Sequence, residues 1–273
     1  MKDQRTTSPF KALWVMTALL LCTGMVWAKP NPKVLIFSKT SKYHHNSIAA
    51  GIRAIQKLGA ENKFDVDTTT DVSKFTDANL KQYATIIFLS PTSASDLVRD
   101  TKNIVFKDSV NKDALKTYMH NGGGFLGIHS ATDFGYEWAW YGKLVGGYFL
   151  GHPARNVQTA RLNVIDKKTP STRNLPDTIS RKDEYYSFKK GSNPPDLHVL
   201  ITLDENTENY GQQTYLKMGD FHPISWYHDY DGGRAFYTAL GHTDESFSEP
   251  FVLNHILGAL QYTMGKKYKG KKQ

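Results

Sequence analysis

Histidine and carboxylate side chains recur in this chain where apolar, strand-like runs give way to loops. Imidazole and carboxylate groups gathered in one cleft can act as general acids and bases near neutral pH. The same groups can hold a divalent metal such as zinc. The side chains concerned are His45, His129, His152 and His242, with Asp133 and Glu184 as carboxylates. The residue types therefore favour proton-transfer chemistry, metal-ion chemistry, or both.

The most informative stretch is 122–131, which has the sequence GGGFLGIHSA. Glycines surround the apolar run 125–128, and His129 stands where this predicted strand turns into the next loop. Small neighbours at such an elbow expose the side chain that follows the strand. An amidotransferase of this architecture would place cysteine at this position. This chain has histidine there and its one cysteine is Cys22, so glutamine hydrolysis through a thioester is excluded. Ser130 lacks the Gly-x-Ser-x-Gly surroundings of a hydrolase elbow, which disfavours it as a nucleophile.

These motifs assign provisional roles to nine residues. The predicted catalytic residues are His129, Glu184 and Asp133. The predicted substrate-binding residues are His45, Ser130, His152, Tyr185, Trp226 and His242. The metal-ligand candidates are His45, His129, His152, Glu184 and His242, and no His-x-x-x-His spacing singles out a subset. A shared site requires His129 and Glu184 to lie within about 12 Å of each other, the reach of one bridged substrate.

Strand-like and helical patterns alternate along the first half of the chain. Strands are predicted at 33–37, 64–68, 85–90 and 125–128, and helices from Asn46 to Gly59, over 77–83 and over 109–120. This alternation is typical of a parallel sheet covered by helices on both faces. Right-handed crossovers make such a sheet doubly wound. Its ligands bind at the carboxyl ends of the strands.

The pattern changes after Gly151. Strands are predicted at 162–165, 184–188, 197–203, 224–227 and 234–240, with a last helix at 250–264. We interpret this half as part of the same α/β domain, with extra antiparallel strands and long loops over the carboxyl edge of a mostly parallel sheet. The predicted domain covers 29–265 and is followed by a basic tail, 266–273.

Five segments in order resemble proteins of the trehalose-utilisation (ThuA-like) family. They are HHNS at 44–47, GGGFLGIHSATD at 122–133, GGYF at 146–149 with His152-Pro153, DEYY at 183–186, and His222-Pro223 through GGRAFYTALGH at 232–242. The resemblance implies a flavodoxin-like fold similar to class I glutamine amidotransferases, without their cysteine. It also implies a role in the use of trehalose or other sugars. One departure is His44, where the family usually carries arginine.

The first 28 residues have the pattern of a cleavable export signal. Basic residues precede the apolar stretch 12–21, and Val26-Trp27-Ala28 supplies the cleavage site. An uncleaved anchor or a lipid on Cys22 is the alternative. Cys22 is the only cysteine, so the mature chain has no disulfide, no thiolate metal site and no cysteine nucleophile. We therefore expect export to the periplasm or beyond, with no stable membrane insertion after cleavage.

The resulting hypothesis is an enzyme that acts on a sugar or an oxidised sugar derivative. Isomerisation, hydration, elimination or hydrolysis would all use proton transfer, with or without a metal. The alternative is a periplasmic carbohydrate-binding protein without turnover. A glycosidase with paired carboxylates is disfavoured because acidic residues are sparse in the motifs. The net charge of +8 is concentrated in the tail, and no nucleic-acid-binding module is visible, so the expected partner is a small sugar-derived ligand.

Overall fold

The computed structural model describes residues 30–93, 101–194 and 196–265. The predicted export signal at 1–28 and the basic tail at 266–273 lie outside these residues. The chain from Asn31 onward forms one compact unit by its internal contacts. Within the described ranges, every helix is too short or too polar to cross a membrane.

The centre of the fold is a nine-stranded sheet with the order β2-β1-β3-β4-β11-β10-β9-β6-β7. Its first five strands are parallel to one another. They are β1 (Lys33–Phe37), β2 (Asp65–Thr69), β3 (Tyr83–Leu89), β4 (Gly124–Ile128) and β11 (Gly233–Thr238). With β11 as the fifth strand, this is the 2-1-3-4-5 order of flavodoxin-like sheets. The predicted α/β fold is confirmed.

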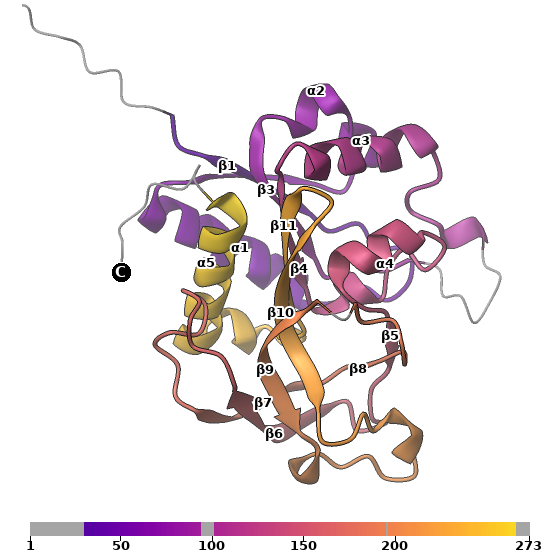
Figure 1. The fold of residues 1–273 in the computed structure, drawn as a ribbon, viewed down its shortest axis with the longest axis vertical. Coiled ribbons are helices and arrows are strands. Elements are labelled where there is room, and N and C mark those ends of the chain that lie inside the picture. Colours follow the sequence, from indigo (N-terminus) through magenta and orange to yellow (C-terminus); the bar gives the residue numbers. More distant parts are fainter. Residues whose placement is uncertain (1–29, 94–100, 195, 266–273) are drawn as a thin grey trace, which may run out of the picture. The chain divides into compact units, whose positions relative to one another are not determined.

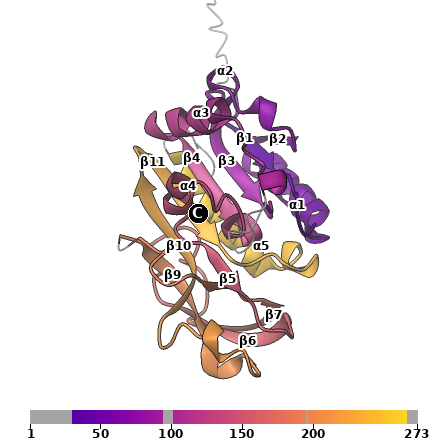
Figure 2. The ribbon, with the colours of Figure 1, turned by 90° about the vertical axis from the view of Figure 1, so that its right-hand side faces the viewer.

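Antiparallel strands extend the sheet beyond β11. They are β10 (His222–Tyr230), β9 (His198–Asp204), β6 (Val157–Val164) and β7 (Thr178–Glu184). Two short strands, β5 (Phe149–Gly151) and β8 (Ser187–Phe188), pair in a separate small sheet. The strand predicted at 184–188 was therefore wrong in extent, because the chain leaves the large sheet at Glu184 and enters the small one at Ser187. Figures 1 and 2 both show β6 and β7 at the end of the molecule away from α2 and α3.

Helices cover both faces of the parallel strands. They are α1 (Ser47–Asn62), α2 (Asp77–Leu80), α3 (Ser109–His120), α4 (Ala139–Val145) and α5 (Pro250–Met264). Short 3-10 helices span Val72–Lys74, Thr101–Asn103, His129–Thr132, Glu205–Thr207, Thr214–Leu216 and Glu245–Phe247. Figure 1 shows α1 and α5 on one side of the sheet and α3 and α4 on the other.

The first helix continues past the predicted stop at Gly59 and ends at Asn62. A Cβ at Gly59 would lie 2.6 Å from the carbonyl oxygen of Phe64, so this glycine allows helix and chain to approach closely. The left-handed turn that ends the helix is instead made by Lys63, at φ 61°.

The core is built on the apolar parallel strands. All seven residues of β3 and all five of β4 are buried. Phe37 of β1 and Phe88 of β3 pack together with ring centroids 5.0 Å apart, and Phe106 and Phe134 close over them. This densely packed core holds the loops at the carboxyl ends of the parallel strands in fixed positions.

A buried histidine in α5 makes the stability of the fold depend on pH. The Nδ1–H of His255 donates to the carbonyl of Ser171 at 3.0 Å, and its Nε2 lies 2.9 Å from Ser225 Oγ. Burial lowers the pKa of His255 to about 4. The unfolded chain takes up the proton near pH 6.5, so acidification favours unfolding. Between about pH 6.5 and about pH 4, each unit costs about 1.4 kcal/mol of unfolding free energy.

Replacing His255 with asparagine should remove this contribution. We expect the free energy of unfolding, measured by urea denaturation, to fall between pH 7 and pH 5 in both proteins. The fall should be about 2 kcal/mol larger in the wild type than in His255→Asn. Equal losses in the two proteins would contradict the assignment.

Candidate functional site

The side chain of His129 is fully buried at the carboxyl end of β4. Its backbone has a left-handed φ of 51°, a conformation that is energetically unfavourable for residues other than glycine. The chain turns sharply here from β4 into a 3-10 helix. The ring Nδ1 lies 2.9 Å from the carbonyl oxygen of Ala239. Because a carbonyl only accepts, Nδ1 carries the hydrogen, and in the neutral ring Nε2 presents a lone pair.

Three further side chains meet this Nε2. His129 Nε2 is 3.2 Å from His45 Nε2, 3.2 Å from His242 Nδ1 and 3.3 Å from Glu184 Oε2. The pair formed by His242 Nδ1 and Glu184 Oε2 is 3.0 Å apart. We call His45, His129, Glu184 and His242 the histidine–glutamate cluster. It brings together the loop after β1, the end of β4, the end of β7 and the loop after β11.

The charges of the histidine–glutamate cluster are set by burial and mutual contact. Burial, followed by the neighbouring His129 and His242, lowers the pKa of His45 to about 2, so this ring is neutral. Burial alone would raise the pKa of Glu184, but its close contacts with the rings of His129 and His242 hold it below its usual value. For His242, burial would lower the pKa, whereas the contact with Glu184 raises it. A buried carboxylate thus stands among three imidazoles.

A buried aspartate holds two members of this cluster in place. The Oδ1 of Asp183 accepts from the backbone N–H groups of Glu184 at 3.0 Å and His242 at 3.2 Å. Its Oδ2 accepts from the N–H of Gly241 at 3.0 Å and from Arg181 Nη1 at 2.5 Å. Arg181 is also paired with Glu249 at 3.0 Å. Asp183 therefore ties the end of β7 to the loop after β11.

A cleft of about 270 Å³ opens onto the cluster. Its lining consists of Tyr43, His45, Asp133, Phe149, His152, Asn156, Glu184, Tyr186 and His242. Tyr186 packs on His129 with ring centroids 4.4 Å apart and on Phe149 at 4.3 Å, so one wall is aromatic. The other lining groups are mostly polar. Flat apolar faces beside hydrogen-bonding groups suit a small amphipathic ligand.

Asp133 and His152 flank the cluster within the cleft. Burial raises the pKa of Asp133 to about 6, although Tyr136 donates a 2.7 Å hydrogen bond to its Oδ1. This carboxyl can therefore exchange a proton near neutral pH. His152 donates from Nδ1 to the carbonyl of Pro153 at 3.0 Å, and its Nε2 lies 3.5 Å from Glu184 Oε1. Its side chain is 36% exposed, so a ligand can reach it.

The sequence model of the ThuA family, described as trehalose utilisation, matches residues 33–263. The chain belongs to the ThuA family. A protein from Bacteroides uniformis described as ThuA-like is 27% identical, with a TM-score of 0.69 over 88% of this chain and 94% of its own. A ThuA-like protein from Parabacteroides merdae, 19% identical, shares the fold with a TM-score of 0.63 over 89% and 93% of the two chains. No curated protein matches the chain.

Similarity of fold extends to a larger enzyme. The β-galactosidase from Bacillus circulans has a TM-score of 0.51 and 10% identity, over 85% of this chain and 30% of its own. At this identity only the fold is shared. The ThuA family itself indicates a carbohydrate-related function for the chain.

Not every residue that the sequence singled out lies at the ThuA chain's cleft. Tyr185 is fully buried and donates to the carbonyl of Arg181 at 2.8 Å. Trp226 is fully buried on β10 and donates to the carbonyl of Val145 at 2.9 Å. Both were predicted to bind the substrate, and the structure contradicts this because each ring packs inside the core. Ser130 is also buried, and its Oγ lies 3.3 Å from His45 Nδ1, so it supports a cluster residue.

The sequence analysis assigned no role to four residues of the cleft lining or to the aspartate that supports the cluster; these are Tyr43, Phe149, Asn156, Tyr186 and Asp183. Tyr186 lines the cleft where its neighbour Tyr185 was expected, because successive side chains of an extended chain point to opposite sides. Asp183 was noted only as part of a motif. A signal for it was available, since Arg181 and Asp183 stand two residues apart and share one face of β7.

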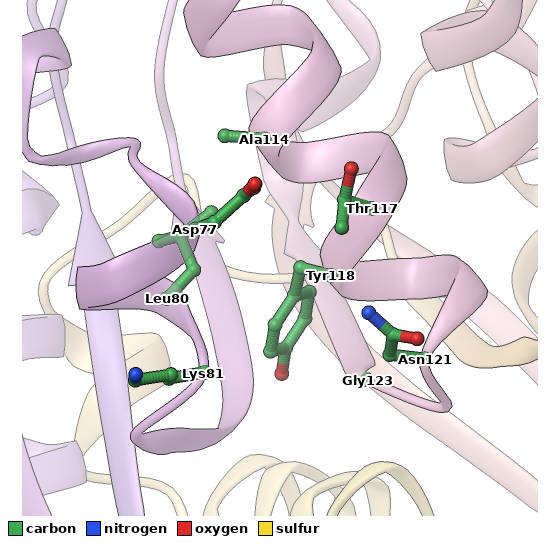
Figure 3. A pocket seen from close by; sticks show the side chains of 8 residues that line it. All are labelled: Asp77, Leu80, Lys81, Ala114, Thr117, Tyr118, Asn121 and Gly123. Carbon is green, nitrogen blue, oxygen red and sulfur yellow. The ribbon is translucent and has the colours of Figure 1, made fainter.

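A second pocket, of about 350 Å³, lies away from these residues. Figure 3 shows its lining: Asp77, Leu80, Lys81, Ala114, Thr117, Tyr118, Asn121 and Gly123. Gly123 precedes β4, whereas His129 follows it, so this pocket borders the opposite edge of the sheet. The Tyr118 hydroxyl is engaged with the backbone of Gly124. With no histidine in its lining, this larger pocket offers less chemistry than the cleft.

Proposed function

We propose that the cleft binds a sugar or an oxidised sugar derivative and transfers protons on it. The observation that carries this proposal is the histidine–glutamate cluster at the bottom of a small cleft, with Asp133 and His152 beside it. The cleft volume of about 270 Å³ is below the roughly 300–1,000 Å³ of sites for drug-sized ligands. A single sugar ring is therefore a suitable occupant. The association of the ThuA family with trehalose use supports a carbohydrate.

The proposed chemistry is the shift of a proton between a sugar carbon and the oxygen of a neighbouring carbonyl. The carboxylate of Asp133, whose pKa is about 6, removes the proton from carbon and returns it to the neighbouring carbon. The developing oxyanion is stabilised by His242 in its protonated form, which the contact with Glu184 favours and which His129 helps to hold in place. Reversal from the other carbon gives an isomer, and loss of a neighbouring hydroxyl gives elimination. His45, His152 and His242 contact the substrate in this proposal.

The second candidate is a carbohydrate-binding protein without turnover. The aromatic wall of Tyr186 and Phe149 favours it, because stacking on a sugar needs no catalytic group. The same cleft would then bind a sugar that is released unchanged.

Calorimetric titration of the purified chain with glucose, trehalose and fructose tests both candidates for binding at this cleft. We expect saturable binding of at least one sugar, and weaker binding of it by Glu184→Gln, which keeps the size of the side chain but removes its charge. Binding that is unaffected by Glu184→Gln would place the sugar elsewhere. No binding of sugars or of keto-sugars would contradict the proposal.

We also propose that the protein is exported and that residues 1–28 are removed, because their charged, apolar and small residues follow in the order of a cleavable signal. Mass spectrometry of protein from its native host should find Lys29 at the amino terminus. An intact Met1 or a lipid on Cys22 would overturn this.

A further inference from the structure

We infer that the histidine–glutamate cluster is a binding site for a four-coordinate divalent metal of the zinc class. Each of the four residues offers one ligand atom, and these atoms all lie within 4.8 Å of one another. The shortest contacts are made by His45 Nε2, His129 Nε2, His242 Nδ1 and Glu184 Oε2. The role of the metal in sugar chemistry rests on the proposed function. The site itself stands on its geometry and chemistry.

The spacing of the four atoms fits a tetrahedral ion. Zinc binds imidazole nitrogen and carboxylate oxygen at about 2.0–2.1 Å, which puts the corners of a tetrahedron about 3.3 Å apart. The distances from His129 Nε2 to His45 Nε2, His242 Nδ1 and Glu184 Oε2 are 3.2, 3.2 and 3.3 Å. The distance between His242 Nδ1 and Glu184 Oε2 is 3.0 Å. The three edges from His129 thus have the required length, and the edge between His242 and Glu184 is somewhat shorter.

The outer contacts of the rings leave the inner nitrogens available as ligands. The carbonyl of Ala239 holds the hydrogen of His129 on Nδ1, so its Nε2 lone pair points into the cluster. Ser130 Oγ lies 3.3 Å from His45 Nδ1 and can accept its hydrogen, which leaves Nε2 free in the same way. Metal-ligating histidines usually make such outer hydrogen bonds, which fix the tautomer and the ring direction. Asp183 accepts from the backbone N–H groups of Glu184 and His242 and so holds the backbone of these two ligands in place.

The donor set selects among metals. Three imidazoles and one carboxylate suit zinc and similar transition metals, whereas magnesium and calcium prefer oxygen ligands throughout. The ion-pair partners of Glu184 among the described residues are all histidines, so a cation at the centre would balance a carboxylate that is only 3% exposed. His152 Nε2 lies 3.5 Å from Oε1, the other oxygen of Glu184. We do not assign His152 as a ligand, so it remains available to contact the substrate.

This site reassigns roles within the proposed function. The four cluster residues become ligands, and Asp133 and His152 remain as the groups that move protons in the cleft. A bound divalent ion supplies Lewis-acid stabilisation of a carbonyl or hydroxyl oxygen.

Metal analysis of the full chain, purified without chelators, incubated with zinc and desalted, tests the inference. We expect about one zinc ion per chain in the wild type, and at most about a tenth of that content in His242→Ala and Glu184→Gln. His44→Ala is the matched control, because His44 is exposed and adjoins the cluster in sequence, and it should keep its zinc. Full zinc content in both cluster variants, or none in the wild type, would overturn the site.

A second measurement keeps the test decisive if the variants fail to fold. The melting temperature of the zinc-loaded wild type should fall when a chelator removes the ion, because a ligand bound only by the folded state stabilises it. An unchanged melting temperature after verified zinc removal would overturn the site. The proposed function fails separately. A zinc-loaded protein that binds no sugar contradicts the function alone, and a protein that takes up no zinc but transforms a sugar contradicts the metal site alone.

Discussion

Replacing His129 with alanine is expected to lower turnover of the proposed sugar substrate by about 100- to 1,000-fold, the range for loss of a group needed to stabilise the developing oxyanion. His129 Nε2 is the atom that contacts all three other members of the cluster, so no neighbour can substitute for it. Initial rates measured at saturating sugar give the comparison. His44→Ala, an exposed histidine beside the cluster, should keep wild-type rates.

The same substitution should also affect stability, in contrast to what a site on exposed loops would suggest. His129 is fully buried, and its removal leaves the carbonyl of Ala239 without its 2.9 Å hydrogen bond. A loss of about 1–3 kcal/mol in unfolding free energy is the usual cost of such an unsatisfied group. If His129→Ala kept more than half of the wild-type turnover while folded, the assigned role would be wrong.

Replacing Asp183 with asparagine is expected to lower the free energy of unfolding by about 3–5 kcal/mol, the cost of breaking a buried ion pair. Asparagine has nearly the same shape, so the change removes mainly the charge that Arg181 Nη1 meets at 2.5 Å. It also replaces one acceptor oxygen by an amide nitrogen among three backbone N–H donors. Urea denaturation at pH 7 gives the measurement.

Asp244→Asn is the control for Asp183→Asn. It makes the same chemical change at an exposed position near His242, where substitutions usually alter stability by less than about 0.5 kcal/mol. If Asp183→Asn cost less than about 1 kcal/mol, the buried aspartate would not hold the two loops together as described.

The parallel half of the fold could be predicted because its signals are local. The run 33–37 is apolar and short, and the structure has β1 over the same residues. Helices predicted at 109–120 and 250–264 are also found with those bounds. In each case a strong periodic pattern stands between clear breaks, and tertiary contacts do not override it.

The antiparallel half was harder to predict because local sequence patterns do not determine the order of strands in a sheet. Glu184 reaches His129 only because β7 pairs with β6, β6 with β9, and β9 with β10. Nothing in the run DEYY shows that Tyr185 turns into the core and Tyr186 to the cleft. Tryptophan is a residue type that can stack on a sugar ring, but Trp226 is fully buried on β10 and cannot reach a ligand. Side-chain direction there depends on where the strand ends, which sequence patterns locate poorly.

The most direct test of the central claim is deuterium exchange into a keto-sugar. Fructose, or the keto-sugar that binds best, is incubated with the protein in heavy water and followed by proton NMR. If the cleft removes a proton from a carbon next to a carbonyl, the wild type should exchange that position for deuterium, and His129→Ala should do so at least about 100-fold more slowly. Saturable binding of keto-sugars without any exchange or conversion would contradict catalysis and leave the protein as a carbohydrate-binding member of the ThuA family.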